Sequence, residues 1–200
     1  MLIHLEPLNV EQELKTLRET KQGKIVKCFV GDGEKVNIAN EQFELYLCNM
    51  CVMLTNNPQD FFNEASRILK PGGQAVFSIW GRKEDYVLFN AFRDVIANVS
   101  GVASKLPNFD LHDNIPNLKS MLEKAGFKGF RKEYTNCPLD IYNHKDYMDK
   151  LTFPFVDKLM SGLTKEQVEK VKVDMDKLVK DFENSENFVS MNVLVFSVFK

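Results

Sequence analysis

Residues 43–80 read FELYLCNMCVMLTNNPQDFFNEASRILKPGGQAVFSIW, and this stretch decides the fold. Its first part, residues 43–50, is almost continuously apolar, which is typical of a strand covered on both faces. Asn57-Pro58 predicts the start of a helix, because asparagine caps helices and proline suits the first helical position. We expect Lys70-Pro71-Gly72-Gly73 to end that helix and to turn the chain into a strand over 74–80. A strand, a helix and a strand in this order indicate a right-handed crossover in a parallel sheet.

The alternation of strands and helices continues on both sides of this stretch. Before it, the pattern predicts a short strand at 1–6, a helix at 9–20 and a strand at 24–30 that runs into the turn Gly31-Asp32-Gly33. After it, the pattern predicts helices at 85–98, 118–125 and 164–183 and strands at 127–134 and 189–199. We therefore expect an α/β protein with a doubly wound, mostly parallel sheet.

The composition favours one globular domain inside the cell. Two hundred residues with 44% hydrophobic content suffice for a single buried core. The net charge of −2 and the lack of a basic cluster speak against nucleic acid as a partner. No stretch approaches the roughly 20 apolar residues that span a bilayer, so we expect no membrane association. Four cysteines without the spacing of a disulfide framework fit a reducing compartment, and we predict a cytoplasmic protein.

Three motifs in sequence order carry a family resemblance. They are Gly31-Asp32-Gly33-Glu34, then Phe43-Glu44-Leu45 with Cys48-Asn49, and then Ile68-Leu69-Lys70-Pro71-Gly72-Gly73 leading into a strand. This order resembles class I S-adenosylmethionine (SAM)-dependent methyltransferases of the small-molecule type, most of all the quinone-biosynthesis C-methyltransferases. The resemblance is specific over residues 24–81. It implies a Rossmann-like methyltransferase sheet with the strand order 3-2-1-4-5-7-6 and an antiparallel final strand.

The resemblance also implies a set of cofactor-binding residues, because ligands of such sheets lie beyond the carboxyl ends of the strands. Glu6 would accept hydrogen bonds from the ribose hydroxyls of SAM, and Asp32 would receive the adenine amino group beside the Gly33 backbone. The backbone of Cys48, Asn49 and Met50 would face the methionine end of the cofactor. Lys70-Pro71-Gly72-Gly73 is expected to be structural, and the sequence identifies no catalytic residue and no metal site.

The family pattern also has a strand and a glycine-rich cofactor loop ahead of Glu6, whereas this sequence begins at Met1. That first strand is expected between the strand ending at Glu6 and the strand ending at Cys48, so its absence would leave two edges unpaired. Three outcomes are compatible with this gap. The edges close on each other, a second copy or another chain covers them in a homo- or hetero-oligomer, or the chain is a truncated product of a longer gene.

Several of these residues have simpler interpretations. Asp32 between two glycines is also a common turn residue, and Glu6 is also an ordinary solvated strand end. Cys48-x-x-Cys51 is compatible with a redox or zinc site, but without a second pair at ligand spacing we favour buried packing for Cys48. His112 is either a base that removes a substrate proton or a residue of a surface loop.

Methyl transfer depends mainly on positioning, so it needs few catalytic side chains. We therefore expect a SAM-dependent methyltransferase acting on a small-molecule acceptor. Its single domain, residues 1–200, would carry residues 137–187 as a helical cap inserted between the last two strands. The alternative is a catalytically inactive methyltransferase-like scaffold or partner subunit.

Overall fold

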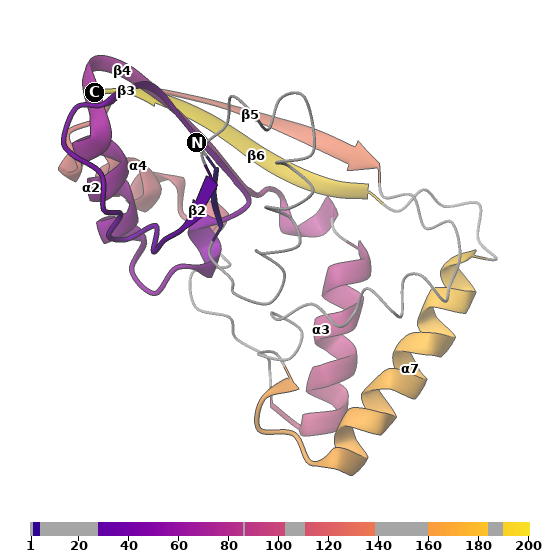
Figure 1. Cartoon of the computed structure of the whole chain (residues 1–200). Coiled ribbons are helices and arrows are strands. Elements are labelled where there is room, and N and C mark those ends of the chain that lie inside the picture. Colours follow the sequence, from indigo (N-terminus) through magenta and orange to yellow (C-terminus); the bar gives the residue numbers. More distant parts are fainter. Residues whose placement is uncertain (1, 5–27, 86, 103–110, 139–159, 184–189) are drawn as a thin grey trace, which may run out of the picture. The chain divides into compact units, whose positions relative to one another are not determined.

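The computed structural model describes residues 2–4, 28–85, 87–102, 111–138, 160–183 and 190–200 (Figure 1). The chain forms two compact units. The first comprises Met1–Ile79, Leu111–Glu133 and Val195–Lys200, and the second comprises Trp80–Asp110 and Tyr134–Leu194. None of the helices in the described ranges is both long and apolar enough to cross a membrane.

The strands form two sheets whose order agrees with the predicted order. The strands are β1 (Leu2–His4), β2 (Cys28–Val30), β3 (Phe43–Asn49), β4 (Leu69–Trp80), β5 (Lys128–Pro138) and β6 (Ser190–Phe199). β1 pairs with β2 in parallel, and the second sheet has the order β3-β4-β6-β5. These two orders correspond to 3-2 and 4-5-7-6 of the expected series. In the expected order 3-2-1-4-5-7-6, strand 1 lies between strands 2 and 4. Within the described residues, the two sheets are separated at this position.

The final strand is antiparallel, as predicted. The Lys200 N–H donates to the Gly73 carbonyl at 2.9 Å, whereas at the other end of β4 the Gly81 N–H donates to the Asn192 carbonyl at 2.9 Å. The start of β4 therefore pairs with the end of β6. β3 and β4, by contrast, run in parallel, with Cys48 opposite Phe77 and Asn49 opposite Ser78.

Helix α2 (Pro58–Ile68) forms as its local sequence predicts. The Asn57 side chain caps it by accepting a hydrogen bond from the Gln59 N–H at 3.1 Å, and proline lies in the first turn. Its apolar residues form a buried stripe: Phe61, Phe62, Ala65 and Ile68. This stripe supplies one side of the core of the first unit.

Phe77 of β4 is the centre of that core. Its ring meets Phe62 of α2 edge-on at a centroid distance of 5.2 Å and stacks on Phe196 of β6 at 5.2 Å. Tyr46 of β3 and Phe127, next to β5, contact the same ring at 5.6 and 6.3 Å. One aromatic side chain thus joins residues separated by most of the chain.

The segment Lys70-Pro71-Gly72-Gly73 differs from the prediction. It was expected as a turn before a strand at 74, but β4 begins at Leu69, directly after α2. Phe43 of β3 pairs with Leu69 and Leu45 pairs with Gln74, so the four residues form an irregularity inside the strand. Gly72 has a φ of 77°, which suits glycine. The strand starts early because partners on both of its edges continue the ladder.

Helix α4 (Ile115–Lys124) also begins earlier than predicted. The Asn114 side chain accepts a hydrogen bond from the Asn117 N–H at 3.0 Å, and proline again lies in the first turn. The predicted helix started at residue 118, although Asn114 and Pro116 repeat the capping chemistry of Asn57-Pro58. α4 packs against α2 in the first unit.

In the second unit, helices α3 (Val87–Ser100) and α7 (Lys165–Glu183) pack side by side (Figure 1). A capping box starts α7, as the sequence Thr164-Lys165-Glu166-Gln167 indicates. The Thr164 N–H donates to Gln167 Oε1 at 2.9 Å, and the Gln167 N–H donates to Thr164 Oγ1 at 3.2 Å. α7 belongs to the predicted cap 137–187. Residues 139–159 and 184–187 of that cap lie outside the described residues, so its role stays a prediction.

Candidate functional site

The turn that follows β2 carries the predicted adenine-binding residue. The Lys35 N–H donates to the Asp32 carbonyl at 3.0 Å, and the Glu34 N–H donates to Asp32 Oδ1 at 2.9 Å. Asp32 is exposed and Gly33 is buried. The turn interpretation and the ligand interpretation of Asp32 are therefore compatible. Oδ1 holds the turn, and within the described residues Oδ2 has no hydrogen bond, so it keeps its capacity to accept one.

Glu34 connects this turn to the segment that follows β3. Its Oε1 accepts hydrogen bonds from the backbone N–H groups of Asn56 at 2.6 Å and Asn57 at 3.1 Å. Asn57 is the cap of α2, so a carboxylate lies at the positive end of that helix. The turn at Asp32 is thereby fixed beside the start of α2.

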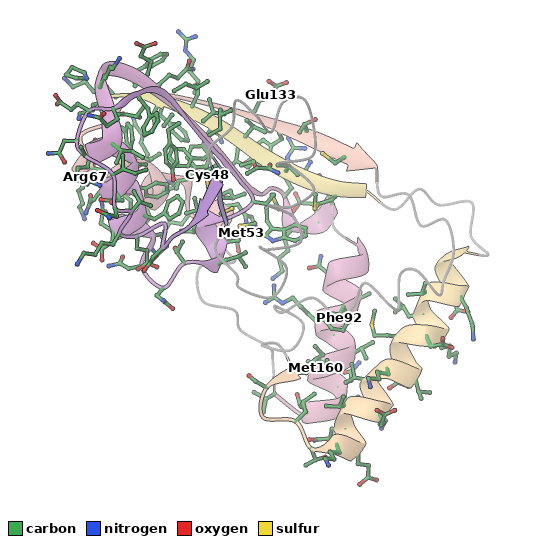
Figure 2. The ribbon with its side chains drawn as sticks, viewed as in Figure 1. Cys48, Met53, Arg67, Phe92, Glu133 and Met160 are labelled. Atoms are coloured by element: carbon green, nitrogen blue, oxygen red, sulfur yellow. The ribbon has the colours of Figure 1, made fainter. Side chains whose placement is uncertain are left out.

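Arg67, near the end of α2, fixes the rest of the loop (Figure 2). Its guanidinium group donates to both carboxylate oxygens of Glu64 at 2.7 Å. It also donates to three acceptors of the loop, namely Ile38 O at 2.7 Å, Asn40 Oδ1 at 2.7 Å and Val36 O at 3.1 Å. The hydrogen bond from Arg67 is the main reason why the pKa of Glu64 is lowered. We call this arrangement the Arg67 clamp.

The carboxyl end of β3 is held by one serine of β4. Ser78 Oγ donates to Asn49 Oδ1 at 2.6 Å, and the Met50 N–H reaches both Ser78 O and Ser78 Oγ at 3.0 Å. Met50 has a φ of 54°, a left-handed conformation that costs a residue with a side chain about 1–2 kcal/mol. The chain therefore bends sharply after Asn49, at the position predicted to face the cofactor.

Two thiols flank this bend. Cys48 is buried, as its packing interpretation predicted, whereas Cys51 is only half-buried. The Cys51 thiol donates to the Asn49 carbonyl at 3.1 Å. The Cys48 thiol in turn hydrogen-bonds to Cys51, and this bond together with burial raises the pKa of Cys48, while the same bond lowers the pKa of Cys51.

The structure describes five of the six predicted cofactor-binding residues. Asp32 and Gly33 follow β2, Cys48 and Asn49 end β3, and Met50 follows that strand. Glu34 links the turn at Asp32 to the start of α2. Glu6 lies outside the described residues, and the convergence of these positions on one cofactor stays a prediction.

Sequence reasoning missed two residues of this candidate site, and for His112 only the surface-loop interpretation is wrong. Glu34 stands directly after Gly-Asp-Gly, and Ser78 is the one hydroxyl in the apolar run 75–80, which is the signal that could have found it. His112 was offered as a surface-loop residue or a base. It is buried, and its Nε2 lies 2.9 Å from Asp113 Oδ1.

These residues fit the adenosine and methionine parts of SAM. An exposed carboxylate with one uncommitted oxygen can accept from an amino group, and the adjacent buried glycine has no side chain to obstruct a ring. Within the described residues, no group of three histidine, cysteine or acidic side chains could hold a metal ion.

Residues 4–77 match a protein-family model described as a methyltransferase domain. A curated relative, the uncharacterized protein MJ1123 of Methanocaldococcus jannaschii, is 24% identical over 144 residues, which are 72% of this chain and 63% of the relative. The biotin biosynthesis bifunctional protein BioHC of Teredinibacter turnerae is 30% identical over 101 residues, which are 50% of this chain and 16% of that protein. The chain thus spans less than two thirds of the length of both relatives.

Solved structures show the same fold. The YcgJ protein of Bacillus subtilis has a TM-score of 0.57 at 12% identity, with 99% of this chain and 80% of that chain covered. A SAM-dependent methyltransferase of Thermotoga maritima has a TM-score of 0.51 at 17% identity, with 100% and 73% covered. The fold is therefore the Rossmann-like methyltransferase fold. The matched family model and this fold support S-adenosyl-L-methionine as the cofactor.

Proposed function

We propose that this chain is a SAM-dependent methyltransferase that acts on a small-molecule acceptor. The observation that carries the proposal is the link that the Glu34 hydrogen bonds make between the turn after β2 and the start of α2, the helix that follows β3. Ligands of doubly wound sheets lie at such strand ends. The match of residues 4–77 to the methyltransferase-domain model supports the same activity.

In this proposal each turn holds one part of the cofactor. Asp32 accepts from the adenine amino group through Oδ2, and Gly33 leaves room beside the ring. The backbone of residues 48–50 faces the methionine part, and Ser78 keeps that bend in place. Glu6 is assigned to the ribose hydroxyls.

The bound cofactor supplies an electrophilic methyl group on a sulfonium, so the protein mainly has to position the acceptor and exclude water. We assign the cover of the acceptor to residues 137–187, which include α7. The resemblance to quinone-biosynthesis C-methyltransferases suggests an aromatic ring as the acceptor. This is the most specific part of the proposal.

Calorimetric titration with SAM and with S-adenosylhomocysteine tests the proposal. The unmodified chain is expected to bind both with micromolar affinity. Asp32→Asn keeps an oxygen for the Glu34 N–H but offers the cofactor an amino group, so binding is expected to weaken about tenfold, which corresponds to about 1.4 kcal/mol. Asp94→Ala, at an exposed position on α3, is the matched control and is expected to change nothing. Failure of the unmodified chain to bind either ligand at millimolar concentration would refute the proposal.

A specific observation also favours the second candidate, a catalytically inactive methyltransferase-like scaffold or partner subunit. Leu45 and Leu47 of β3 are 52% and 68% exposed, and within the described residues β3 pairs only with β4. An apolar strand with an unpaired edge can form backbone hydrogen bonds with a strand of another chain. Native mass spectrometry decides between a monomer, which contradicts this candidate, and a complex of two or more chains.

A further inference from the structure

The thiol groups of Cys48 and Cys51 have no role in the proposed methyl transfer, yet their placement is specific. Cys48 is the second-last residue of β3 and is 7% exposed, whereas Cys51 is half-buried and occupies the N-cap position of the short 3₁₀ helix Val52–Leu54 without a side-chain capping hydrogen bond. Between them, the left-handed Met50 bends the chain back on itself. Two cysteines three residues apart are thereby placed in one tight bend.

The bend places Cys51 next to the backbone that it turns around, because the Cys51 thiol donates to the Asn49 carbonyl at 3.1 Å. Cys51 is also the more accessible of the two thiols. The side-chain interaction with Cys48 lowers the pKa of Cys51. Cys51 therefore has the properties of an attacking thiolate, and Cys48 those of a resolving thiol beside it.

We propose that Cys48 and Cys51 are a modification site that forms a reversible disulfide with hydrogen peroxide as the oxidant. The Cys51 thiolate attacks one peroxide oxygen, the O–O bond breaks, and a sulfenic acid and water result after proton uptake. The Cys48 sulfur then attacks the Cys51 sulfur, the S–S bond forms, and the S–O bond breaks with loss of a second water. In sum, two thiols and one peroxide give one disulfide and two waters, and a dithiol reductant reverses the change.

Two other interpretations of the motif explain less of this geometry. A zinc site needs further ligands, and among the described residues no third histidine, cysteine or acidic group joins the pair. Packing alone explains the burial of Cys48. It does not explain why the partly exposed Cys51 contacts it or why a residue with a side chain adopts the left-handed conformation between them.

The disulfide would act on the proposed cofactor site, and this part of the inference rests on the proposed function. A bond between the sulfurs removes the hydrogen bond from Cys51 to the Asn49 carbonyl. It also constrains Met50, whose N–H is held by Ser78. Because residues 48–50 are assigned to the methionine part of SAM, the oxidised chain is expected to bind SAM about tenfold more weakly than the reduced chain.

Peptide mass mapping of the unmodified chain tests the disulfide directly. Trypsin releases residues 36–67 as one peptide that contains Cys48 and Cys51, while Cys28 and Cys137 fall in other peptides. After treatment with hydrogen peroxide and alkylation with N-ethylmaleimide, we expect this peptide unalkylated and about 2 Da lighter than its dithiol form. Dithiothreitol should restore two alkylation sites. A peptide that stays doubly alkylated, or carries a sulfinic acid, would overturn the proposal.

Variants and a binding assay separate the disulfide from its effect. The double variant Cys28→Ser, Cys137→Ser keeps the pair and is the matched control for Cys51→Ser, which must leave Cys48 unlinked. SAM is then titrated into the reduced and the oxidised chain. Equal affinity of the two forms would overturn the regulatory part. No binding by the reduced chain would refute the methyltransferase proposal. The disulfide proposal is tested separately, by the peptide mass alone.

Discussion

Removal of the Arg67 clamp is the perturbation whose effect the structure defines best. Arg67→Ala deletes five hydrogen bonds, of which two go to Glu64 and three go to the loop 36–40. Among the described residues, Arg67 is the only side chain that donates hydrogen bonds to the carbonyl oxygens of Val36 and Ile38, and the loop loses both bonds. At about 1 kcal/mol of net stabilisation for each loop bond, the upper limit is about 3 kcal/mol. Water reaches the partly exposed site, so we expect a loss of about 2 kcal/mol in the free energy of unfolding.

Urea denaturation followed by circular dichroism measures this loss as a lower midpoint at an unchanged slope. Arg67→Lys keeps the charge but not the planar fork, so its midpoint is expected between those of Arg67→Ala and the unmodified chain. Lys119→Ala is the matched control, because Lys119 pairs with Glu123 across 3.7 Å on an exposed helix face and should cost less than about 0.5 kcal/mol. If Arg67→Ala shifts the midpoint no more than this control, the clamp does not stabilise the loop and the reasoning fails.

Three further predictions concern the core, a glycine that has no room for a side chain, and an ion pair. Phe62→Ala removes a fully buried ring and should cost about 3–5 kcal/mol in the same denaturation assay, and a loss below 1 kcal/mol would contradict the described core. Gly81→Ala would place a Cβ 2.1 Å from the Asn192 side-chain oxygen, so thermal unfolding should show a loss of about 1–3 kcal/mol rather than none. Because Arg67 lowers the folded-state pKa of Glu64, the carboxylate stabilises the fold above the ordinary value of 4.5, and this contribution is lost as the pH falls through the lowered pKa. The stability difference between the unmodified chain and Glu64→Gln should therefore shrink on acidification, and a difference that grows would refute the sign.

The elements that sequence reasoning predicted well are those whose signals are local. α2 needs only its Asn57 cap, its proline and its apolar spacing, all of which lie within a dozen residues. The early start of β4 could not be predicted in this way. It depends on Phe43 on one edge and Lys200 on the other, which are far apart in the sequence. The sequence indicated a turn because proline and glycine are locally typical of turns.

The candidate site shows the same division. Asp32 and Asn49 could be proposed as site residues because polar residues at the ends of apolar strands are visible in the sequence, and their binding role stays a prediction. Ser78 was missed because its role depends on the register that places it opposite Asn49, and no pattern within one strand reports register. Glu34 was missed for a similar reason, because its partners Asn56 and Asn57 lie more than twenty residues away.

The central position of Phe77 has a consequence for biosynthesis. Its ring stacks on Phe196, so the core of the first unit cannot close while that residue is still inside the ribosome. Until then Phe62 and Tyr46 have only part of their final neighbours, and the nascent chain exposes an incomplete apolar layer. Folding of this unit must therefore wait until Phe196 has left the ribosome, and during that interval a chaperone would have the most exposed apolar surface to protect.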